Sequence, residues 1–241
     1  MLHNIVFLSL VISITLNTIG IFFSYFLLRR KDYFPRIQQR SYTIATLNKR
    51  MPLIYLNLAF LYILTYLGLT LTKTAFSWQS LPWWNILIQC VFLSLIDDFY
   101  FYFYHRTLHR NMWLFRKIHK IHHKAHSPLP IEYIYVHPLE WFIGAAGLVI
   151  GYLLLFFITG SLNCYVFLLY LTFRTVHELD IHSGINSFFA NYIPFFASAE
   201  HHDLHHAKPT LGNYASTYLF WDKCLGTLAS IRKNKKIRTH T

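Results

Sequence analysis

The feature that most constrains this chain is a series of apolar stretches, which lie at residues 4–28, 52–72, 84–104, 139–158 and 162–173. A membrane helix needs about 20 apolar residues, so the first four are long enough to span a bilayer and the fifth is short. Charged residues make up only 13% of the chain, whereas a soluble domain has roughly a quarter. The sequence therefore predicts an all-α, polytopic membrane protein with four to five membrane helices.

The basic residues between these stretches predict an orientation. Residues 29–50 hold seven Lys or Arg, 106–124 hold six and 174–241 hold eight, whereas 125–173 hold none. Because positive loops stay on the cytosolic side, we expect these basic segments there, together with every histidine from 105 to 206. The first apolar stretch lacks a basic leader and a small-residue cleavage site, which predicts a retained membrane helix rather than a cleaved signal peptide.

The net charge of +12 does not indicate a nucleic-acid-binding protein. Its basic residues come in bursts between apolar stretches, as membrane flanks do, and form no single face or arm. The three cysteines, Cys90, Cys164 and Cys224, are far apart and have no zinc or redox spacing. We expect them to be small buried apolar residues.

Histidine clustering is the strongest functional signal. Eleven of the fifteen histidines lie within residues 105–206, once the isolated His126 and His137 are set aside. Three tight clusters stand out: His105 and His109; His119, His122 and His123; and His202, His205 and His206. Residues three and four apart share a helix face, so we expect each cluster to direct its imidazoles at one point. Eight imidazoles are more than one metal ion normally binds, which predicts a pair of metals.

Iron is the metal that fits this pattern best. Structural zinc usually includes cysteine among four ligands, and no cysteine lies within the clusters. Two hydrolytic zinc ions would leave several histidines without a task. A metal site at the ends of membrane spans faces lipid. Cleavage of an unactivated C–H bond in a lipid needs a redox-active metal, because side chains alone lack that chemistry. A metal transporter and an inactive scaffold are the alternatives, although transporter ligands lie near the bilayer midplane and these clusters lie at the ends of spans.

Two polar residues before the first cluster lie on the same helix face as its histidines. Asp98, Tyr102, His105 and His109 are spaced i, i+4, i+7 and i+11, so they share one helix face. An acidic residue in an apolar span needs a partner. We expect Asp98 and Tyr102 to support the metal ligands, with Asp98 accepting a ring N–H from one of them. The alternatives are that Asp98 snorkels or pairs with Arg106.

Further histidines are candidates for the same site. His182 is an expected ligand, with Glu178 on the same helix face four residues earlier. His177 and His201 are further candidate ligands. His137 directly precedes the fourth apolar stretch, and we expect it to support the site or to begin the helix.

The order and spacing of these clusters resemble the fatty acid hydroxylase superfamily, also called the sterol desaturase family, over residues 92–228. The surrounding residues are similar too: Tyr104-His105-Arg106, His137-Pro138-Leu139-Glu140, Asn213-Tyr214-Ala215 and Trp221-Asp222-Lys223. Residues 178–184 and 193–216 look closest to C4-methyl sterol oxidases. Sterol 25-hydroxylases and fatty acyl or sphingoid hydroxylases or desaturases are alternatives, because His177 and Ile185-Asn186 depart from the sterol oxidase pattern.

The resemblance implies a membrane di-iron monooxygenase that acts on a sterol or related lipid. Its cofactors would be two non-haem iron ions, with O2 as co-substrate and NAD(P)H-derived electrons delivered by cytochrome b5 or a similar carrier, since the chain has no flavin or nucleotide motif. The implied ligands are His105, His109, His119, His122, His123, His182, His202, His205 and His206.

The expected organisation has three parts. Membrane anchor helices occupy residues 1–91, the hydroxylase domain residues 92–228, and a basic cytosolic tail residues 229–241. The expected membrane is the endoplasmic reticulum in a eukaryote and the cytoplasmic membrane in a bacterium. Which lipid and which carbon are oxidised, and whether the outcome is hydroxylation or desaturation, stay open at this stage.

Overall fold

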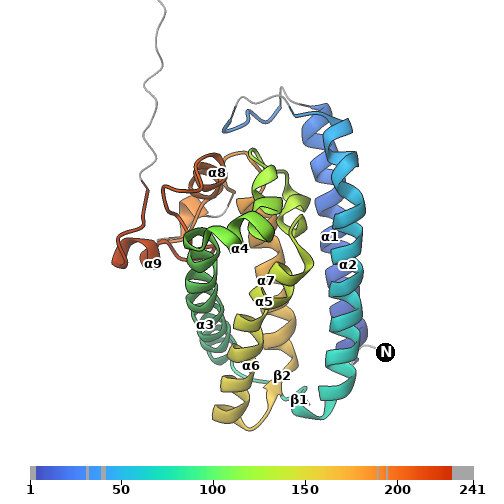
Figure 1. The fold of residues 1–241 in the computed structure, drawn as a ribbon. Coiled ribbons are helices and arrows are strands. Elements are labelled where there is room, and N and C mark those ends of the chain that lie inside the picture. The colour runs from blue at the N-terminus through green and yellow to red at the C-terminus, as the bar shows by residue number, and fades with distance from the viewer. Residues whose placement is uncertain (1–3, 31–32, 39–41, 189, 194, 230–241) are drawn as a thin grey trace, which may run out of the picture.

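The structure is a computed structural model, which describes residues 4–30, 33–38, 42–188, 190–193 and 195–229. The predicted basic tail lies outside the described residues, apart from Ala229. The predicted all-α membrane architecture is confirmed (Figure 1).

Among the described residues, four segments are long and apolar enough to cross a membrane. They are formed by α1 (Ile5–Arg29), by α2 (Ile44–Thr72) with η1 (Lys73–Ala75), by α3 (Trp83–Arg110), and by α5 (Pro138–Gly144) with α6 (Ala146–Thr159). The short fifth stretch lies in α7 (Cys164–Ile181), which is not among these four candidates. A tight turn at Gly160 joins α6 to α7, as the sequence Thr159-Gly160-Ser161 predicts.

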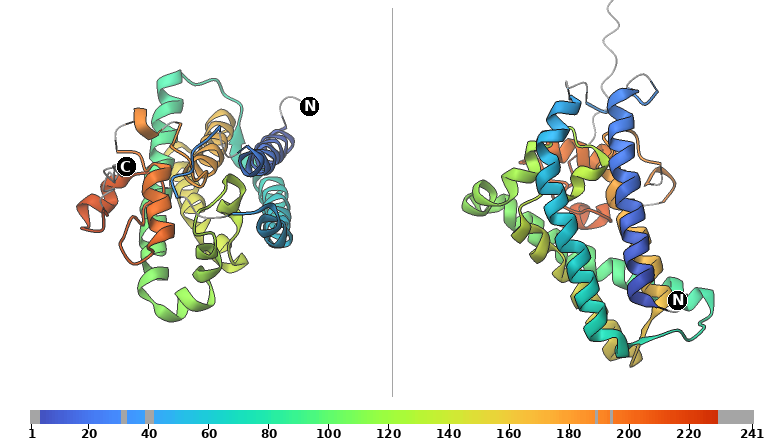
Figure 2. Two further views of the ribbon diagram at one scale, coloured as in Figure 1. Left: turned by 90° about the horizontal axis from the view of Figure 1, so that it is seen from above. Right: turned by 90° about the vertical axis from the view of Figure 1, so that its right-hand side faces the viewer.

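The long helices pack into one bundle. Helices α1 and α2 lie side by side, and α1 also packs on α7, which in turn packs on α3 (Figures 1 and 2). At one end of the bundle the short strands β1 (Phe76–Ser77) and β2 (Leu162–Asn163) pair in parallel. The remaining short elements are α4 (Met112–Lys117), η2 (His119–Lys124), η3 (Pro130–Ile134), η4 (Ala190–Tyr192), α8 (Ala199–Ala207) and α9 (Leu219–Cys224).

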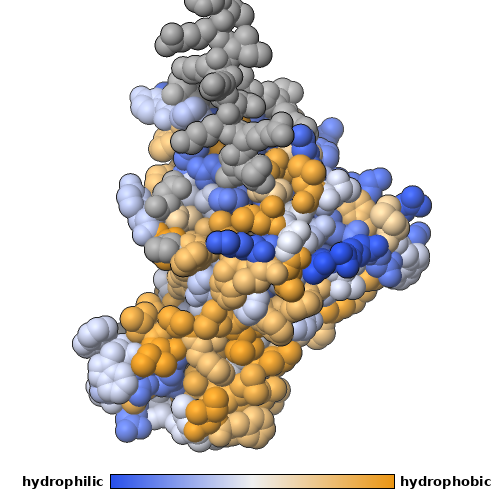
Figure 3. All heavy atoms as spheres, turned by 90° about the vertical axis from the view of Figure 1, so that its left-hand side faces the viewer, coloured by the Kyte–Doolittle hydropathy of each residue, from blue (hydrophilic) through white to orange (hydrophobic). Residues whose placement is uncertain are grey.

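The outer surfaces of the long helices are apolar. Only 22–33% of the residues in the apolar window of each candidate span are buried within the protein. Figure 3 shows one face, on which hydrophobic side chains cover much of the lower body while hydrophilic ones gather higher up. Four helices of spanning length whose outer side chains are apolar fit lipid rather than water, so the chain is an integral membrane protein.

Helices α3 and α6 approach closely at Gly147. A Cβ at this position would lie 2.8 Å from Oδ1 of Asp97 and 2.9 Å from its carbonyl oxygen. Asp97 also accepts hydrogen bonds from Arg174 Nε (2.7 Å) and from Tyr170 Oη (3.0 Å), both on α7. The carboxylate of Asp97 therefore links α3 to α7 at the level of the bundle where α6 comes closest to α3.

The expected burial of the cysteines is only partly correct. Cys164 is buried and Cys90 is partly buried, but Cys224 is exposed. Cys224 is the last residue of the short helix α9, which lies at the outside of the bundle (Figure 1).

Candidate metal centre

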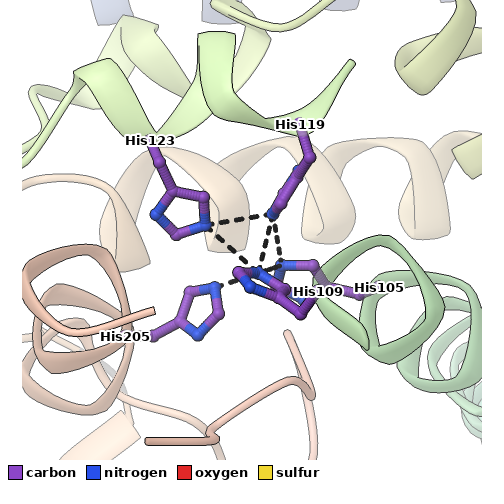
Figure 4. A group of neighbouring side chains, drawn as sticks. All are labelled: His105, His109, His119, His123 and His205. Atoms are coloured by element: carbon purple, nitrogen blue, oxygen red, sulfur yellow. Dashed lines mark hydrogen bonds between the residues drawn. The ribbon is translucent and has the colours of Figure 1, made fainter. Parts of the chain in front are cut away.

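Nine histidines converge at one end of the bundle, where α3 and α7 end. They form two groups, and within each group one ring nitrogen from every residue lies within 4.8 Å of the others. The five-histidine group is His105, His109, His119, His123 and His205 (Figure 4). The four-histidine group is His122, His182, His202 and His206. All nine ligands that the sequence predicts are therefore brought together.

The distribution of these residues corrects one prediction. Each His-x2-His-His cluster was expected to point at one centre, but each is divided between the two groups. On α8, His202 and His206 enter the four-histidine group and His205 enters the five-histidine group. In an α-helix, 3.6 residues per turn place adjacent residues about 100° apart, so His205 and His206 face different centres. Cluster η2 is divided in the same way, although it is a 3-10 helix rather than an α-helix.

The hydrogen bonds of the rings support a cation at the five-histidine group. His105 and His205 donate their Nδ1–H groups to the carbonyl oxygens of Tyr214 and Gly212, each over 2.7 Å. A neutral imidazole has one N–H, so the Nε2 atom of each ring presents a lone pair. These two Nε2 atoms lie only 3.1 Å apart. Two lone pairs at this distance repel each other unless a cation binds both.

Burial keeps these rings neutral, which is the form that binds metal. It lowers the pKa of His119 and of His182 to about 3. Burial, followed by the neighbouring His105, also lowers the pKa of His205 well below its ordinary value. Imidazole nitrogens without any sulfur ligand suit iron, zinc, copper or nickel. The two groups thus fit a metal site.

Glu140 contacts a candidate ligand, although the sequence alone did not assign it a role. Its Oε1 accepts the Nδ1–H of His119 over 2.7 Å, and its side chain is buried. This bond leaves Nε2 of His119 facing the five-histidine group and makes the ring a stronger ligand. A carboxylate at the start of an apolar helix was the available signal, and it stands in the quoted motif His137-Pro138-Leu139-Glu140.

Asp98 acts through the backbone rather than through a histidine ring. It accepts N–H groups from Ser216 (3.2 Å), Thr217 (2.8 Å) and Tyr218 (2.9 Å). The predicted contact with a ligand ring is therefore not formed. Asp98 instead holds the segment that begins just after Tyr214, whose carbonyl orients His105. Tyr102, the other expected support, likewise contacts no ligand nitrogen; its hydroxyl bonds with Oγ1 of Thr227 over 2.8 Å.

The remaining candidates lie outside both groups. His177 bonds through Nε2 to the carbonyl oxygen of Ser216 (2.8 Å), and His201 bonds through Nδ1 to Oγ of Ser198 (2.8 Å). His137 caps α5 by accepting the N–H of Leu139 over 3.1 Å. Of the two roles expected for His137, the structure therefore supports the one at the start of the helix.

A cavity begins at the histidines and extends into the bundle. The histidines in its wall include His105, His119, His122, His182 and His202. The rest of its wall is mainly apolar and comes from α1, α2, α3, α5, α6 and α7, with Phe101, Leu148 and Phe167 among its side chains. An apolar cavity that opens onto a metal site can bring a lipid carbon to the metals while excluding water.

Comparisons with known proteins agree with this geometry. The family model for fatty acid hydroxylase matches residues 90–227. The chain is 39% identical over 171 residues to "Methylsterol monooxygenase 1" of Rattus norvegicus, covering 68% of this chain and 54% of that protein. It is 40% identical over 150 residues to a "Putative methylsterol monooxygenase" of Dictyostelium discoideum, covering 61% and 53%.

A further relative matches along nearly the whole chain. "Very-long-chain aldehyde decarbonylase GL1-8" of Oryza sativa subsp. indica is 29% identical over 243 residues, covering 98% of this chain and 86% of that protein. The chain spans about half the length of the methylsterol monooxygenases that it matches. No solved structure matches it. Because the family model covers more than half of the chain, and the matched region contains all nine clustered histidines, this protein belongs to the fatty acid hydroxylase family.

Proposed function

We propose that this chain is a membrane monooxygenase that oxidises a C–H bond of a sterol or related lipid at a pair of non-haem iron ions. The observation that carries the proposal is the pair of histidine groups at the head of a mainly apolar cavity. All nine histidines are the proposed iron ligands. When bound, the irons would supply the activation of O2 that side chains cannot provide.

The residues of the chain have separate tasks in this proposal. The apolar cavity wall holds the lipid and keeps water away from the reacting carbon. Glu140 holds His119 in the tautomer that binds metal, and the carbonyl of Tyr214 does the same for His105. Asp98 and Tyr102 support the site indirectly, through the 214–218 segment and through Thr227.

Sterols are the proposed substrate class. Two of the relatives quoted above are named for methylsterol oxidation, and residues 178–184 and 193–216 resemble that group in sequence. Oxidation of a C4-methyl group is therefore the first reaction to test. The rice relative is named for a long-chain aldehyde, so an aldehyde belongs in the same substrate panel.

Electrons would come from an external carrier such as cytochrome b5. Exposed basic residues lie beside the five-histidine group, on the end of α3, on α4 and on η2: Arg110, Arg116, Lys117 and Lys120. A basic surface favours encounter with an acidic carrier. The positive loops would place this surface, and the histidines, on the cytosolic side. The proposed membrane is the endoplasmic reticulum in a eukaryotic host.

The metal transporter reading has less support than the oxygenase. His105 and His109 lie in the last two turns of α3, and His182 caps the end of α7. Transporter ligands would lie near the bilayer midplane, on interrupted helices. Both histidine groups lie instead where the long helices end.

The test combines metal analysis with product analysis. Purified full-length protein should contain iron, and membranes that carry it should convert a 4-methyl sterol in the presence of NADH, O2 and a cytochrome b5 system. The variant His122→Ala should abolish product formation. His126→Ala is the matched control, because His126 is exposed and belongs to neither group. Full activity in protein without iron would refute the proposal.

A further inference from the structure

Residues 33–38, which lie between α1 and α2, reach across to the four-histidine group. Arg36, in this segment, donates Nη1 to the carbonyl oxygen of Ser183 over 2.8 Å. It donates Nη2 to the carbonyl oxygens of Ser127 (2.9 Å) and Pro128 (2.7 Å), and to Oγ of Ser127 (2.9 Å). Ser183 directly follows the candidate ligand His182. One guanidinium therefore ties the end of α7 to the segment that follows η2.

A glycine at position 184 allows the guanidinium of Arg36 to approach this closely. Gly184 has a φ of +65°, and a Cβ placed on it would overlap the guanidinium of Arg36. The carbonyl oxygen of Gly184 also accepts the N–H of Ile37 over 2.9 Å. Arg36 and Ile37 thus bond to Ser183 and Gly184, the two residues after His182. Guanidinium donors in a fixed planar fork are well suited to hold several carbonyls at once.

Gln38 makes a second set of hydrogen bonds, to α8 and to the residues after η2. Its Nε2 donates to the side chain of Asp203 (2.7 Å), and also lies within hydrogen-bond distance of the carbonyl oxygens of His126 (2.7 Å) and Asp203 (3.2 Å). Asp203 directly follows the candidate ligand His202 on α8. Two side chains of one short segment therefore bond next to His182 and next to His202.

These two ligands belong to one metal position. Nε2 of His182 and Nε2 of His202 lie 2.9 Å apart, although the residues come from different helices. The four-histidine group depends on the tied elements for three of its members, since α8 also carries His206. The five-histidine group takes His205 from α8 and His119 and His123 from η2, but other partners orient two of these rings: the carbonyl of Gly212 holds His205 and the carboxylate of Glu140 holds His119.

We propose that Arg36 and Gln38 are positioning residues for the metal of the four-histidine group. They keep His182 and His202 at the separation that one ion requires, so the N-terminal part of the chain completes a metal site whose ligands all lie within the family-matched residues. This inference rests on the proposed function, because it needs a metal at each group. It predicts that loss of these contacts weakens metal binding at the four-histidine group and has little effect on metal binding at the five-histidine group.

The experiment measures iron per chain in purified full-length protein during titration with a chelator. In Arg36→Gln, half of the iron should be released at a chelator concentration about tenfold lower than in the wild type, because residues that orient ligands typically change metal affinity by 10–100-fold. The other half should be released at the wild-type concentration. Gln38→Ala should shift the same half by a smaller factor. The Mössbauer spectrum of partly depleted Arg36→Gln should match that of His202→Ala rather than that of His109→Ala.

Arg29→Gln is the control, because Arg29 is an exposed arginine at the end of α1, just before the segment that carries Arg36. It should titrate as the wild type does. The inference is overturned if Arg36→Gln and Gln38→Ala both keep the wild-type titration, or if both irons are released together at a lower chelator concentration, since that indicates general unfolding. Wild-type protein that binds no iron would instead refute the proposed function itself. If Arg36→Gln does not fold, the chelator titration and the Mössbauer spectrum of Gln38→Ala test the inference instead.

Discussion

The bond between Glu140 and His119 offers the sharpest test of how the site holds its metal. The change is Glu140→Gln, which keeps the size of a buried side chain and removes its charge. Oε1 of Glu140 accepts the ring N–H of His119 over 2.7 Å, and the other carboxylate oxygen has no hydrogen-bond partner among the described residues. A glutamine carbonyl can still accept this N–H, but without the added strength of a charged acceptor, which is roughly twofold.

The expected loss follows from the position of Glu140 directly behind a candidate ligand. Replacing such a residue typically lowers metal affinity by 10–100-fold, which corresponds to about 1.4–2.7 kcal/mol. Glu140→Ala should lose more, because it leaves the buried N–H of His119 unpaired at a further cost of about 1–3 kcal/mol. The order of iron affinity should therefore be wild type, then Gln, then Ala.

The assay is a chelator titration of purified protein, read as iron per chain, with a thermal melt of each variant to exclude unfolding. Glu200→Gln is the matched control: Glu200 lies on the first turn of α8, and it forms no hydrogen bond with any of the nine histidines, all of which the structure describes. Its titration should equal that of the wild type. If Glu140→Gln also releases iron at the wild-type chelator concentration, the charge of Glu140 does not strengthen His119 as a ligand and the reasoning fails.

Three other predictions concern stability and pH. Asp98→Ala removes the acceptor of three backbone N–H groups, so it should lower the free energy of unfolding by about 3 kcal/mol or more, measured as a lower Tm in detergent, whereas Asp98→Asn should lose less. Gly147→Val should separate α3 from α6, because its Cβ would overlap Asp97, and should lower the Tm more than Gly68→Val on α2, where an added Cβ would meet nothing within 4 Å. Metal-free protein should lose stability as the pH falls from 6.5 towards 3, because His119 and His182 have folded-state pKa values of about 3 and the unfolded chain takes up the protons; each contributes up to about 1.4 kcal/mol per pH unit. A Tm of the chelated protein that does not change between pH 7 and pH 5 would contradict the last of these.

The helices and most candidate ligands could be predicted because their signals are local. A continuous apolar run predicts a span, and the spacing of His105 and His109 predicts one shared face of α3, as the structure has it. The centre to which each histidine contributes could not be predicted, because helical spacing gives a direction from one axis but not what lies there. The division of His205 from His206 appears only when α8 has been placed between two centres.

The supports of the site were harder to predict because they join distant parts of the chain. Glu140 and His119 are 21 residues apart, and the Asp98 bonds reach residues about 118–120 positions away. The segment with Arg36 and Gln38 carries no recognisable motif, and its bonds span 88 residues or more. Such pairs depend on packing of the long helices, so the ligand pattern alone contains no information about them.

The crossed arrangement of the histidines explains why two clusters contain adjacent pairs. Neighbouring residues point about 100° apart on an α-helix and about 120° apart on a 3-10 helix, so a single metal could use only one of His205 and His206, or one of His122 and His123. Two metals side by side can use all four, with one member of each pair facing each centre. Both α8 and η2 then serve both groups, while α3 serves only the five-histidine group and the end of α7 only the four-histidine group. The shared elements would fix the distance between two metals, and the unshared ones would complete each centre separately, so we expect loss of the Arg36 contact beside His182 to affect the metal of the four-histidine group more than the other.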